Sequence, residues 1–516
     1  MKRLDNLLAA AMCAFILFFF ASTAAAGTIY VKWNSPSPDQ GQSWDTAFHT
    51  VQAGANAAVS GDEVRVAAGT YVESITLKDG IKLLGGYSGV GEERDRRAFV
   101  TVLDGGGAWY VLSSSSGITS ATQVDGFTIT NEGSGVYCWG GSPTVSNNII
   151  GPDYGPAIGC NYSAAPLILN NVVTGNTNYP TPTIWIEQSS PTIAGNTISN
   201  GRMAIYCSQS APVITGNRIV GNVSQAGTYG MYCISSSPII TNNLIANNAT
   251  SYTGSAIKCW YGDAPVVVNN TVVGNTCLLA TYPSGAIEIA SPNAIVRNNL
   301  VAFNNAGICC YQTPLAFENN DSFENDAYQY DGFPTDPTGT SGNISLDPMF
   351  RDLAAGDYRL RWDSPCVDAG TNDGAPETDI LGVLRPIDGN WDGLAVTDIG
   401  AYEYGPLPVT VDIMPGNDSN AINLQPNRLI TVAVLGNAEF DARSIDAKSV
   451  TFGPGNACEV HKQGHFQDAN SDGFTDLVLH FRCGDTGIQP GISTAILRGR
   501  LTDGERIEGS DVVRAR

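Results

Sequence analysis

One short pattern recurs eight times between residues 135 and 320 and constrains the fold more than any other feature of the chain. Each copy has a small residue, a Pro, a short apolar run, an Asn and a second apolar run, as in SPTVSNNII (142–150). In six copies the Asn lies five residues after the Pro, the seventh (SPNAIVRNNLV) delays it to Asn299, and the eighth (TPLAFENNDSF) is degenerate. The aligned residues, 21 to 29 positions apart, are Asn148, Asn171, Asn196, Asn217, Asn243, Asn270 and Asn299. This period is typical of a solenoid in which each repeat forms one coil.

A second run, apolar-variable-apolar, precedes every Pro turn, as in AIYC and AIKC. Side chains alternate along a strand, so the first and third positions are expected to face inward. The inward set is Val136, Ile158, Ile184, Ile205, Met231, Ile257, Ile287 and Ile308, followed by Cys138, Cys160, Ile186, Cys207, Cys233, Cys259, Ile289 and Cys310. Three short strands per coil, stacked in parallel at ~4.8 Å, predict an all-β right-handed parallel β-helix. The stacked Asn amides are expected to form a ladder, because an unpaired buried amide is costly.

The cysteines have two interpretations. An exported chain rich in cysteine can carry a disulfide framework, or the thiols can form a buried stack inside the coils. Ile186 and Ile289 replace cysteine at equivalent positions, which favours the core stack. Cys458 and Cys483 lie outside the solenoid, on either side of an acidic loop, and are predicted to form a disulfide.

The first segment of the chain indicates where the protein is expected to work. Residues 1–26 combine a basic start, an apolar run and a small-residue end, which is typical of a secretory signal peptide. No later stretch is apolar enough to cross a bilayer. We therefore expect a secreted protein, extracellular or on the cell surface, and a monomer. The net charge of −22 argues against nucleic acid as a partner, since phosphates require basic residues.

The remaining segments differ in pattern. Within the entry module, residues 43–59 have a helical period, with Ser43 as the expected N-cap of a helix that covers the open end of the solenoid. The expected order is a cap with the first coils (27–110), the β-helix repeats (111–342), a loop-rich β block (343–404), a linker (405–408) and a small β-sandwich-like domain (409–516).

Two stretches resemble known families. The entry sequence QSWDTAFHTVQAGANAAVSGDEVRVAAGTY with LLGGYSG resembles the start of bacterial secreted right-handed β-helix proteins of the pectate-lyase-like superfamily. LDPMFRD, GDYRLRWDSPCVDAG and DIGAYEY resemble the choice-of-anchor Q domain, and residues 409–516 look like an accessory domain of exported bacterial proteins. The resemblance implies a fold and an extracellular address; it implies no activity, since this fold hosts several.

Two acidic loops are candidate calcium sites. DANSDGFTD supplies Asp468, Asn470, Asp472 and Asp476, with the Phe474 carbonyl as a further ligand, at the spacing of a calcium loop. DGNWDG supplies Asp388, Asn390 and Asp392, with Asp398 following, and lacks a correctly placed terminal acid. We expect structural Ca²⁺, with an ordinary Asp/Asn turn as the alternative.

The outward positions of the cysteine-bearing strands carry a row of rings. They are Tyr137, Trp139, Trp185, Tyr206, Tyr232, Trp260 and Tyr311, called the aromatic strip below. Exposed aromatic rows are unusual and suit flat sugar faces, so the strip predicts polysaccharide binding. The alternative is that long loops cover the rings.

Catalytic residues are sparse on the same face. The candidates are Lys258, Glu288 and Glu187, but the two glutamates are four coils apart, roughly 19 Å at the strand spacing, too far for a glycosidase pair. Lys258 and Glu288 are expected to form a surface salt bridge. The sequence therefore favours a β-helix protein that binds polysaccharide without cutting it. A polysaccharide lyase or glycoside hydrolase with an atypical site, and a structural or adhesive surface protein, are the alternatives.

Overall fold

The structure, a computed structural model, describes residues 26–130, 133–151, 154–224, 230–251, 254–277, 284–417 and 419–516. Apart from Ala26, the predicted signal peptide lies outside the described residues. Within the described chain, no helix is long and apolar enough to cross a membrane.

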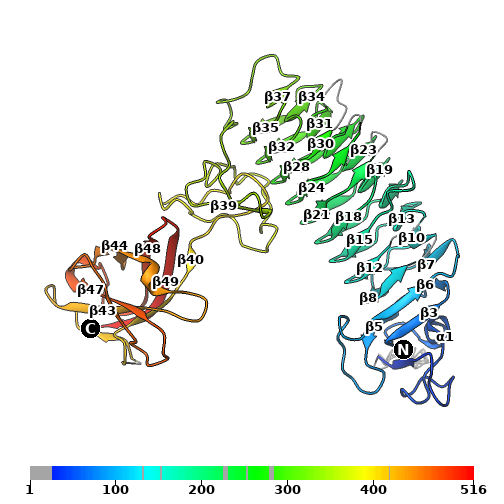
Figure 1. Cartoon of the computed structure of the whole chain (residues 1–516), viewed down its shortest axis with the longest axis horizontal. Helices are drawn as coiled ribbons and strands as arrows, with labels where there is room; N and C mark the ends of the chain where they lie inside the picture. Colours follow the sequence, from blue (N-terminus) through cyan, green and yellow to red (C-terminus); the bar gives the residue numbers. More distant parts are fainter. Residues whose placement is uncertain are drawn as a thin grey trace, which may run out of the picture.

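Three parallel sheets build a right-handed β-helix, which appears in Figure 1 as a stack of coils running from blue to green. The first sheet contains β1 (Thr28–Val31), β2 (Glu63–Ala67), β5 (Lys82–Tyr87), β8 (Gln123–Asp125), β11 (Thr144–Ser146), β14 (Leu167–Leu169), β17 (Thr192–Ala194), β20 (Val213–Thr215), β24 (Ile239–Thr241), β28 (Val266–Val268), β32 (Ile295–Arg297) and β35 (Ala316–Glu318). The second contains β3 (Gly69–Val72), β6 (Thr101–Asp104), β9 (Thr128–Thr130), β12 (Ile149–Ile150), β15 (Val172–Thr174), β18 (Thr197–Ser199), β21 (Arg218–Val220), β25 (Leu244–Ala246), β29 (Thr271–Val273), β33 (Leu300–Ala302) and β36 (Asp321–Phe323).

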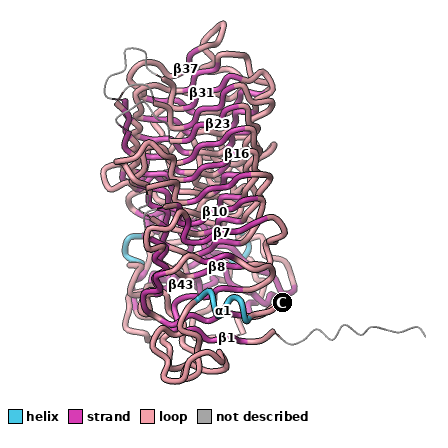
Figure 2. Tube along the Cα trace, turned by 90° about the vertical axis from the view of Figure 1, so that its right-hand side faces the viewer, coloured by secondary structure: helices cyan, strands magenta, loops and turns pink. Residues whose placement is uncertain are grey.

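The third sheet carries the aromatic strip. Its strands are β4 (Ile75–Thr76), β7 (Tyr110–Ser115), β10 (Ser134–Trp139), β13 (Ile158–Asn161), β16 (Ile184–Glu187), β19 (Ile205–Ser208), β23 (Met231–Ile234), β27 (Ile257–Trp260), β31 (Ile287–Ala290), β34 (Ile308–Cys310) and β37 (Tyr330–Asp331). A short fourth sheet joins β22 (Val223–Ser224), β26 (Ala249–Thr250) and β30 (Thr276–Cys277). Figure 2 shows the strands of successive coils lying one above another, so equivalent residues form columns.

The interior confirms the predicted inward residues. Every one of them is at most 1 % exposed. Cys138 pairs in register with Cys160, and Cys233 lies between Cys207 and Cys259. All of these thiols are free, which confirms the core stack over the disulfide framework.

Asparagine ladders close the turns. In the predicted ladder, the Asn171 amide donates to Val145 O at 2.9 Å and to Asn196 Oδ1 at 3.0 Å, while its own Oδ1 accepts from Asn148. The same pattern continues through Asn320 to Asn343. A second ladder, not predicted, links Asn222, Asn248, Asn275, Asn304 and Asn325. Both ladders satisfy buried backbone groups that would otherwise be unpaired.

The cap helix is shorter than predicted. Helix α1 spans Val51–Ala57, and its N-cap is Thr50, whose side chain accepts from Ala53 N, so Ser43 is not the cap. Glu73 accepts from the N–H groups of Val51 and Gln52 as well. A carboxylate from the neighbouring coil at the positive end of the helix therefore fixes its start.

Residues 344–404 pack on the outside of the second sheet, and we call the surface beneath them the covered face. This segment has only two strands, β38 (Phe350–Asp352) and β39 (Asp357–Leu360). Its apolar residues bury Leu244, Ala246, Val273, Leu300 and Ala302 of the coils. Asn242, Asn269, Asn298 and Asn319, each one residue before a ladder Asn, donate to backbone carbonyls of the segment.

The C-terminal domain is the predicted β-sandwich. One sheet contains β40 (Leu407–Pro408), β42 (Ala421–Ile422), β44 (Ile445–Phe452), β45 (Ala457–Cys458), β48 (Gly491–Leu501) and β49 (Arg506–Ala515), and the other contains β41 (Thr410–Ile413), β43 (Leu429–Leu435), β46 (His465–Gln467) and β47 (Asp476–Arg482). Two 3₁₀ turns, η1 (Ala442–Ser444) and η2 (Cys483–Asp485), complete it. Leu407 and Pro408, predicted as linker, pair with β49.

The predicted disulfide of this domain is wrong. Both Cys458 and Cys483 are free. The Cys458 side chain is exposed, whereas the buried Cys483 thiol donates to Asn423 O at 3.9 Å. The two thiols therefore face different surroundings and form no bond.

Candidate functional site

The outward residues of the third sheet form two parallel columns, which we call the open face. One column runs through Tyr137, Gly159, Trp185, Tyr206, Tyr232, Lys258, Glu288, Cys309 and Asp331. The other runs through Trp139, Asn161, Glu187, Ser208, Ile234, Trp260 and Ala290. The strict register of the coils, set by the ladders inside, places these residues next to one another.

The aromatic strip is most open at its two ends. Trp139 is 50 % exposed and Tyr311 is 57 % exposed, while the other five rings are half-buried. The middle rings cover one another edge to face, with centroids 6.4 Å apart for Trp185 and Tyr206. The rings of the strip therefore pack in three groups and not as isolated side chains: Tyr137 with Trp139, Trp185 with Tyr206 and Tyr232, and Trp260 with Tyr311.

Two further rings, absent from the prediction, extend this surface. Tyr162 stacks on Trp139 with centroids 4.3 Å apart and is 54 % exposed. Tyr261 lies 5.6 Å from Trp260 and is 68 % exposed. Both occupy the turn position just after the strand, with φ near +55° to +60°. Their equivalent place in the aligned repeats was the signal that could have identified them.

A polar groove runs beside the strip, along the turns that follow these strands. Its volume is about 400 Å³, and it crosses the coils at residues 163–165, 188–190, 209–211 and 235–237. Serine, glutamine and alanine line it together with Asp263, and the Gln188 amide donates to Gln209 Oε1 at 3.0 Å. Hydroxyl and amide groups beside aromatic rings can orient a polyhydroxylated ligand.

Lys258 and Glu288 meet on neighbouring strands, β27 and β31. Their Nζ–Oε2 distance is 2.7 Å, and their side chains are 9 % and 1 % exposed. The predicted pair is thus formed, but it is buried and not a surface salt bridge. The Lys258 ammonium also lies over the Trp260 ring, 4.1 Å from its centroid, in a cation–π contact.

Four more ionisable groups lie near Glu288 at this end of the sheet: Cys309, Asp331, Tyr311 and Tyr328. Cys309 follows Glu288 in the column, and its thiol donates to Asp331 Oδ2 at 3.8 Å. Burial, and then the charge of Asp331, raises the pKa of Cys309 to about 11. Burial also raises the pKa of Tyr311 and Tyr328, with the charges of Glu288 and Cys309 adding to the effect. Such a group of perturbed side chains is typical of functional sites.

Glu187 is not part of this group. It stands in the other column, on β16, four strands from Glu288 on β31. The structure therefore keeps the two predicted glutamates apart, as the sequence indicated. Asp331 is nearer to Glu288, two strands away in the same column, which corresponds to about 9.6 Å at the strand spacing. Asp331 lies outside the regular repeats, so the repeat pattern could not identify it.

The two acidic loops have the same conformation. In each, the first Asp accepts from the fifth and sixth backbone N–H groups, and the fifth Asp accepts from the seventh, within 388–394 and 468–474. Asp476 is fully buried, with its oxygens on Gly436 N and Ala469 N. Asp398 is also buried and accepts from Asp368 N and Tyr404 N, so neither residue turns freely toward its loop.

Comparisons with known proteins agree with this architecture. The family model "Right handed beta helix region" matches residues 222–332, and "Periplasmic copper-binding protein (NosD)" matches residues 56–263. The solved structure of pectate lyase Pel9A is 15 % identical, with a TM-score of 0.51 over 74 % of this chain and 97 % of that chain. XylC with xylose is 10 % identical, with a TM-score of 0.43 over 73 % and 98 %. A search of curated proteins found no match. These findings show the right-handed β-helix, pectate-lyase-like fold.

Proposed function

We propose that this chain is an exported, monomeric protein that binds extracellular or cell-surface polysaccharide along the open face. The observation that carries the proposal is the pair of exposed aromatic platforms at the two ends of the strip. One consists of Trp139 with Tyr162, and the other of Tyr261 and Tyr311, which both pack against Trp260. From β10 to β34 is seven strands, about 34 Å at ~4.8 Å per strand. A ligand that contacts both platforms is therefore an extended chain.

The groups between the platforms suit sugar hydroxyls. The indole N–H groups of Trp185 and Trp260, and the side-chain oxygen of Asn161, have no hydrogen-bond partner among the described residues, but these atoms are buried, so a sugar reaches them only when the side chains turn outward. The Ser/Gln groove supplies further donors and acceptors alongside. The chain carries a net charge of −22, which repels anionic ligands. Together with the neutral polar groups beside the rings, this charge favours neutral or weakly charged glycans.

Retention on a panel of immobilised neutral and acidic polysaccharides tests the proposal. We expect at least one glycan to retain the protein, and Trp139→Ala with Tyr162→Ala to release it. Trp33→Ala is the matched control, since Trp33 is 54 % exposed but lies in the N-terminal module. Equal retention of both variants would exclude the strip as the binding surface.

The cluster around Glu288 supports a second candidate function, a lyase or glycoside hydrolase. Lys258 is a candidate base. The carboxylates of Glu288 and Asp331 are separated by roughly the distance found between the two carboxylates of an inverting glycosidase. Incubation with the same panel tests this. Unsaturated product absorbing in the ultraviolet, or new reducing ends, lost in Lys258→Met or Asp331→Asn, would establish an enzyme. Retention of the protein without any product would support binding alone. If the protein is neither retained nor forms product, a structural or adhesive role is favoured.

We further propose that the 468–476 loop binds a structural Ca²⁺. Asp468, Asn470 and Asp472 supply oxygen ligands with Gly473 at the turn, and the Phe474 carbonyl follows. Asp476 is committed to backbone donors, so it would orient the loop. Chelation is expected to lower the melting temperature of the C-terminal domain, and Asp472→Ala to abolish that response. The shorter 388–393 loop, tested with Asp392→Ala, is expected to respond less.

A further inference from the structure

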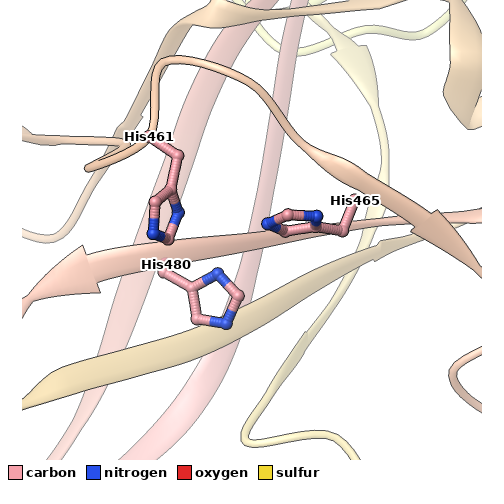
Figure 3. A group of neighbouring side chains, drawn as sticks. All are labelled: His461, His465 and His480. Carbon is pink, nitrogen blue, oxygen red and sulfur yellow. The ribbon is translucent and has the colours of Figure 1, made fainter.

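Three histidines from separate segments of the C-terminal domain converge on one point. His461 lies in the turn after β45, His465 begins β46, and His480 is in β47. Each histidine offers one ring nitrogen, and these three nitrogens lie within 4.8 Å of one another. Figure 3 shows the three rings gathered around a common space. The centroids are 5.4 to 5.7 Å apart and the rings are steeply inclined to one another, so this is not a stack of parallel rings.

The sheet explains why the rings meet. Leu479 and Phe481 on either side of His480 are fully buried in the sandwich core, so the His480 ring lies on the outer face of its sheet. His465 pairs with Val478, which makes His480 its diagonal neighbour on that face. Val460 N donates to His480 O at 3.0 Å and brings the 461 turn over the same place.

A buried carboxylate orients one of the rings. Glu459 is 3 % exposed, and its Oε1 lies 3.1 Å from Nδ1 of His461. Its other oxygen accepts from Gln463 N, which fixes the carboxylate in the turn. The contact leaves Nε2 of His461 as the free ligand nitrogen. Carboxylate-histidine pairs of this kind hold metal-binding imidazoles in the required tautomer.

The remaining features of the cluster suit a metal rather than a hydrogen-bond network. Nδ1 of His480 is buried and has no hydrogen-bond partner among the residues that the structure describes. His461 and His465 are separated by three residues, the H-x₃-H spacing of zinc ligands. Zn–N bonds of about 2.0–2.1 Å require the three ligand nitrogens to lie closer together than 4.8 Å. The exposed His461 and His465 rings can turn inward to bring them that close.

We propose that His461, His465 and His480 form a three-histidine site for a late transition-metal dication, with Zn²⁺ as its best occupant and Glu459 as the residue that positions His461. Three imidazoles leave a fourth tetrahedral position open to water or an external ligand. Neutral imidazoles without thiolate or several carboxylates favour Zn²⁺ or Cu²⁺ over Ca²⁺ and Mg²⁺. The site lies outside the segments matched by family models, 56–263 and 222–332, and is independent of the open face.

Titration of the full chain with Zn²⁺, in excess Ca²⁺ so that the acidic loops are occupied, tests the proposal. We expect one Zn²⁺ per chain at this site. His461→Ala and His465→Ala are the main variants, because both side chains are exposed and their removal leaves the core intact. Glu459→Gln is expected to weaken binding roughly 10- to 100-fold, and each histidine variant more strongly.

Two variants serve as controls. The chain has four histidines, and His49, exposed in the N-terminal module, is the fourth, so His49→Ala should bind Zn²⁺ like the wild type. Cys458→Ser removes the exposed thiol near the site and should also leave affinity unchanged. The Cu²⁺ form should show nitrogen hyperfine structure in its electron paramagnetic resonance spectrum. Absence of stoichiometric Zn²⁺ binding, or unchanged binding in His461→Ala with His465→Ala, would overturn the proposal.

Discussion

The covered face and the open face belong to the same solenoid, yet their outward residues serve different purposes. On the second sheet, one outward column changes from exposed Val172, at 44 %, to Leu244 and Leu300, at 0 and 1 %, where residues 344–404 pack. On the third sheet, rings continue along the face, and those at the ends remain about half exposed. Apolar residues on the covered face are explained by packing, whereas the exposed rings on the open face are the basis of the proposed polysaccharide binding.

The buried ion pair of the open face is expected to give the largest effect. Lys258→Met leaves the buried carboxylate of Glu288 without its partner. We expect this substitution to lower the free energy of unfolding by about 3–5 kcal/mol at neutral pH. Chemical denaturation of the β-helix, followed by circular dichroism, measures this. Lys258→Met with Glu288→Leu should recover most of the loss. A single variant as stable as the wild type would mean that the pair is solvated.

Truncation on the covered face is expected to come next. Leu300→Ala should destabilise the β-helix by about 3 kcal/mol, because the site is filled from both the coil and the covering segment. Val172→Ala is the matched control in the same outward column and should cost less than about 1 kcal/mol. Equal losses in the two variants would remove the distinction between covered and uncovered coils.

Asp321, beneath the covering segment, is expected to make the stability of the fold depend on pH. It is fully buried on β36, accepts from Leu346 N at 3.1 Å, and lies 3.2 Å from the Cys366 thiol. Burial raises its pKa from 3.8 to about 6. Its contribution to stability is therefore complete below about pH 4 and lost as the pH rises through about 6, because the native state favours the protonated form. Asp321→Asn should be about 3 kcal/mol more stable than the wild type at pH 7.

Unfolding free energies measured from pH 4 to 7 test the sign of this effect. The wild type should lose stability relative to Asp321→Asn across that interval, and Asp326→Asn on an exposed turn should follow the wild type. A variant that is less stable than the wild type at pH 7 would show that the ionised carboxylate is favoured in the folded protein.

Repetition decided how much could be predicted from the sequence. The coil strands, the buried Cys stack and the first Asn ladder follow from residues that recur at fixed places, and all three are confirmed. The second ladder, from Asn222 to Asn325, was missed because its residues follow the more variable end of each repeat. Tyr162 and Tyr261 lie at one equivalent position of the repeat, directly after β13 and β27, and were missed because the strip was taken to end with the strands.

Contacts between distant segments were beyond the pattern. The packing of 344–404 on the coils, the approach of Asp331 to Cys309 and the histidine cluster depend on chain crossings that no periodicity encodes. The helix start at Thr50 depends on Glu73 from the next coil. The Cys458 and Cys483 pairing failed because nearness to one loop in sequence did not bring the thiols together.

The smallest effect on stability should accompany the largest effect on binding. Trp139→Ala with Tyr162→Ala, and Tyr261→Ala with Tyr311→Ala, remove exposed rings and should each change the unfolding free energy by about 0.5 kcal/mol or less. Calorimetric titration with a polysaccharide that retains the wild type measures their affinity. We expect each pair to weaken binding of the long chain by about tenfold, or ~1.4 kcal/mol, through lost ring stacking.

The most direct test compares a long chain with a short fragment of the same polysaccharide on these two variants. If one extended ligand spans the open face, each double variant weakens binding of the long chain. The quadruple variant, which combines all four substitutions, loses both contributions to the binding free energy. The short fragment, which reaches only one platform, should respond to one variant and not to the other. Unchanged affinity of the quadruple variant for the long chain would contradict the account.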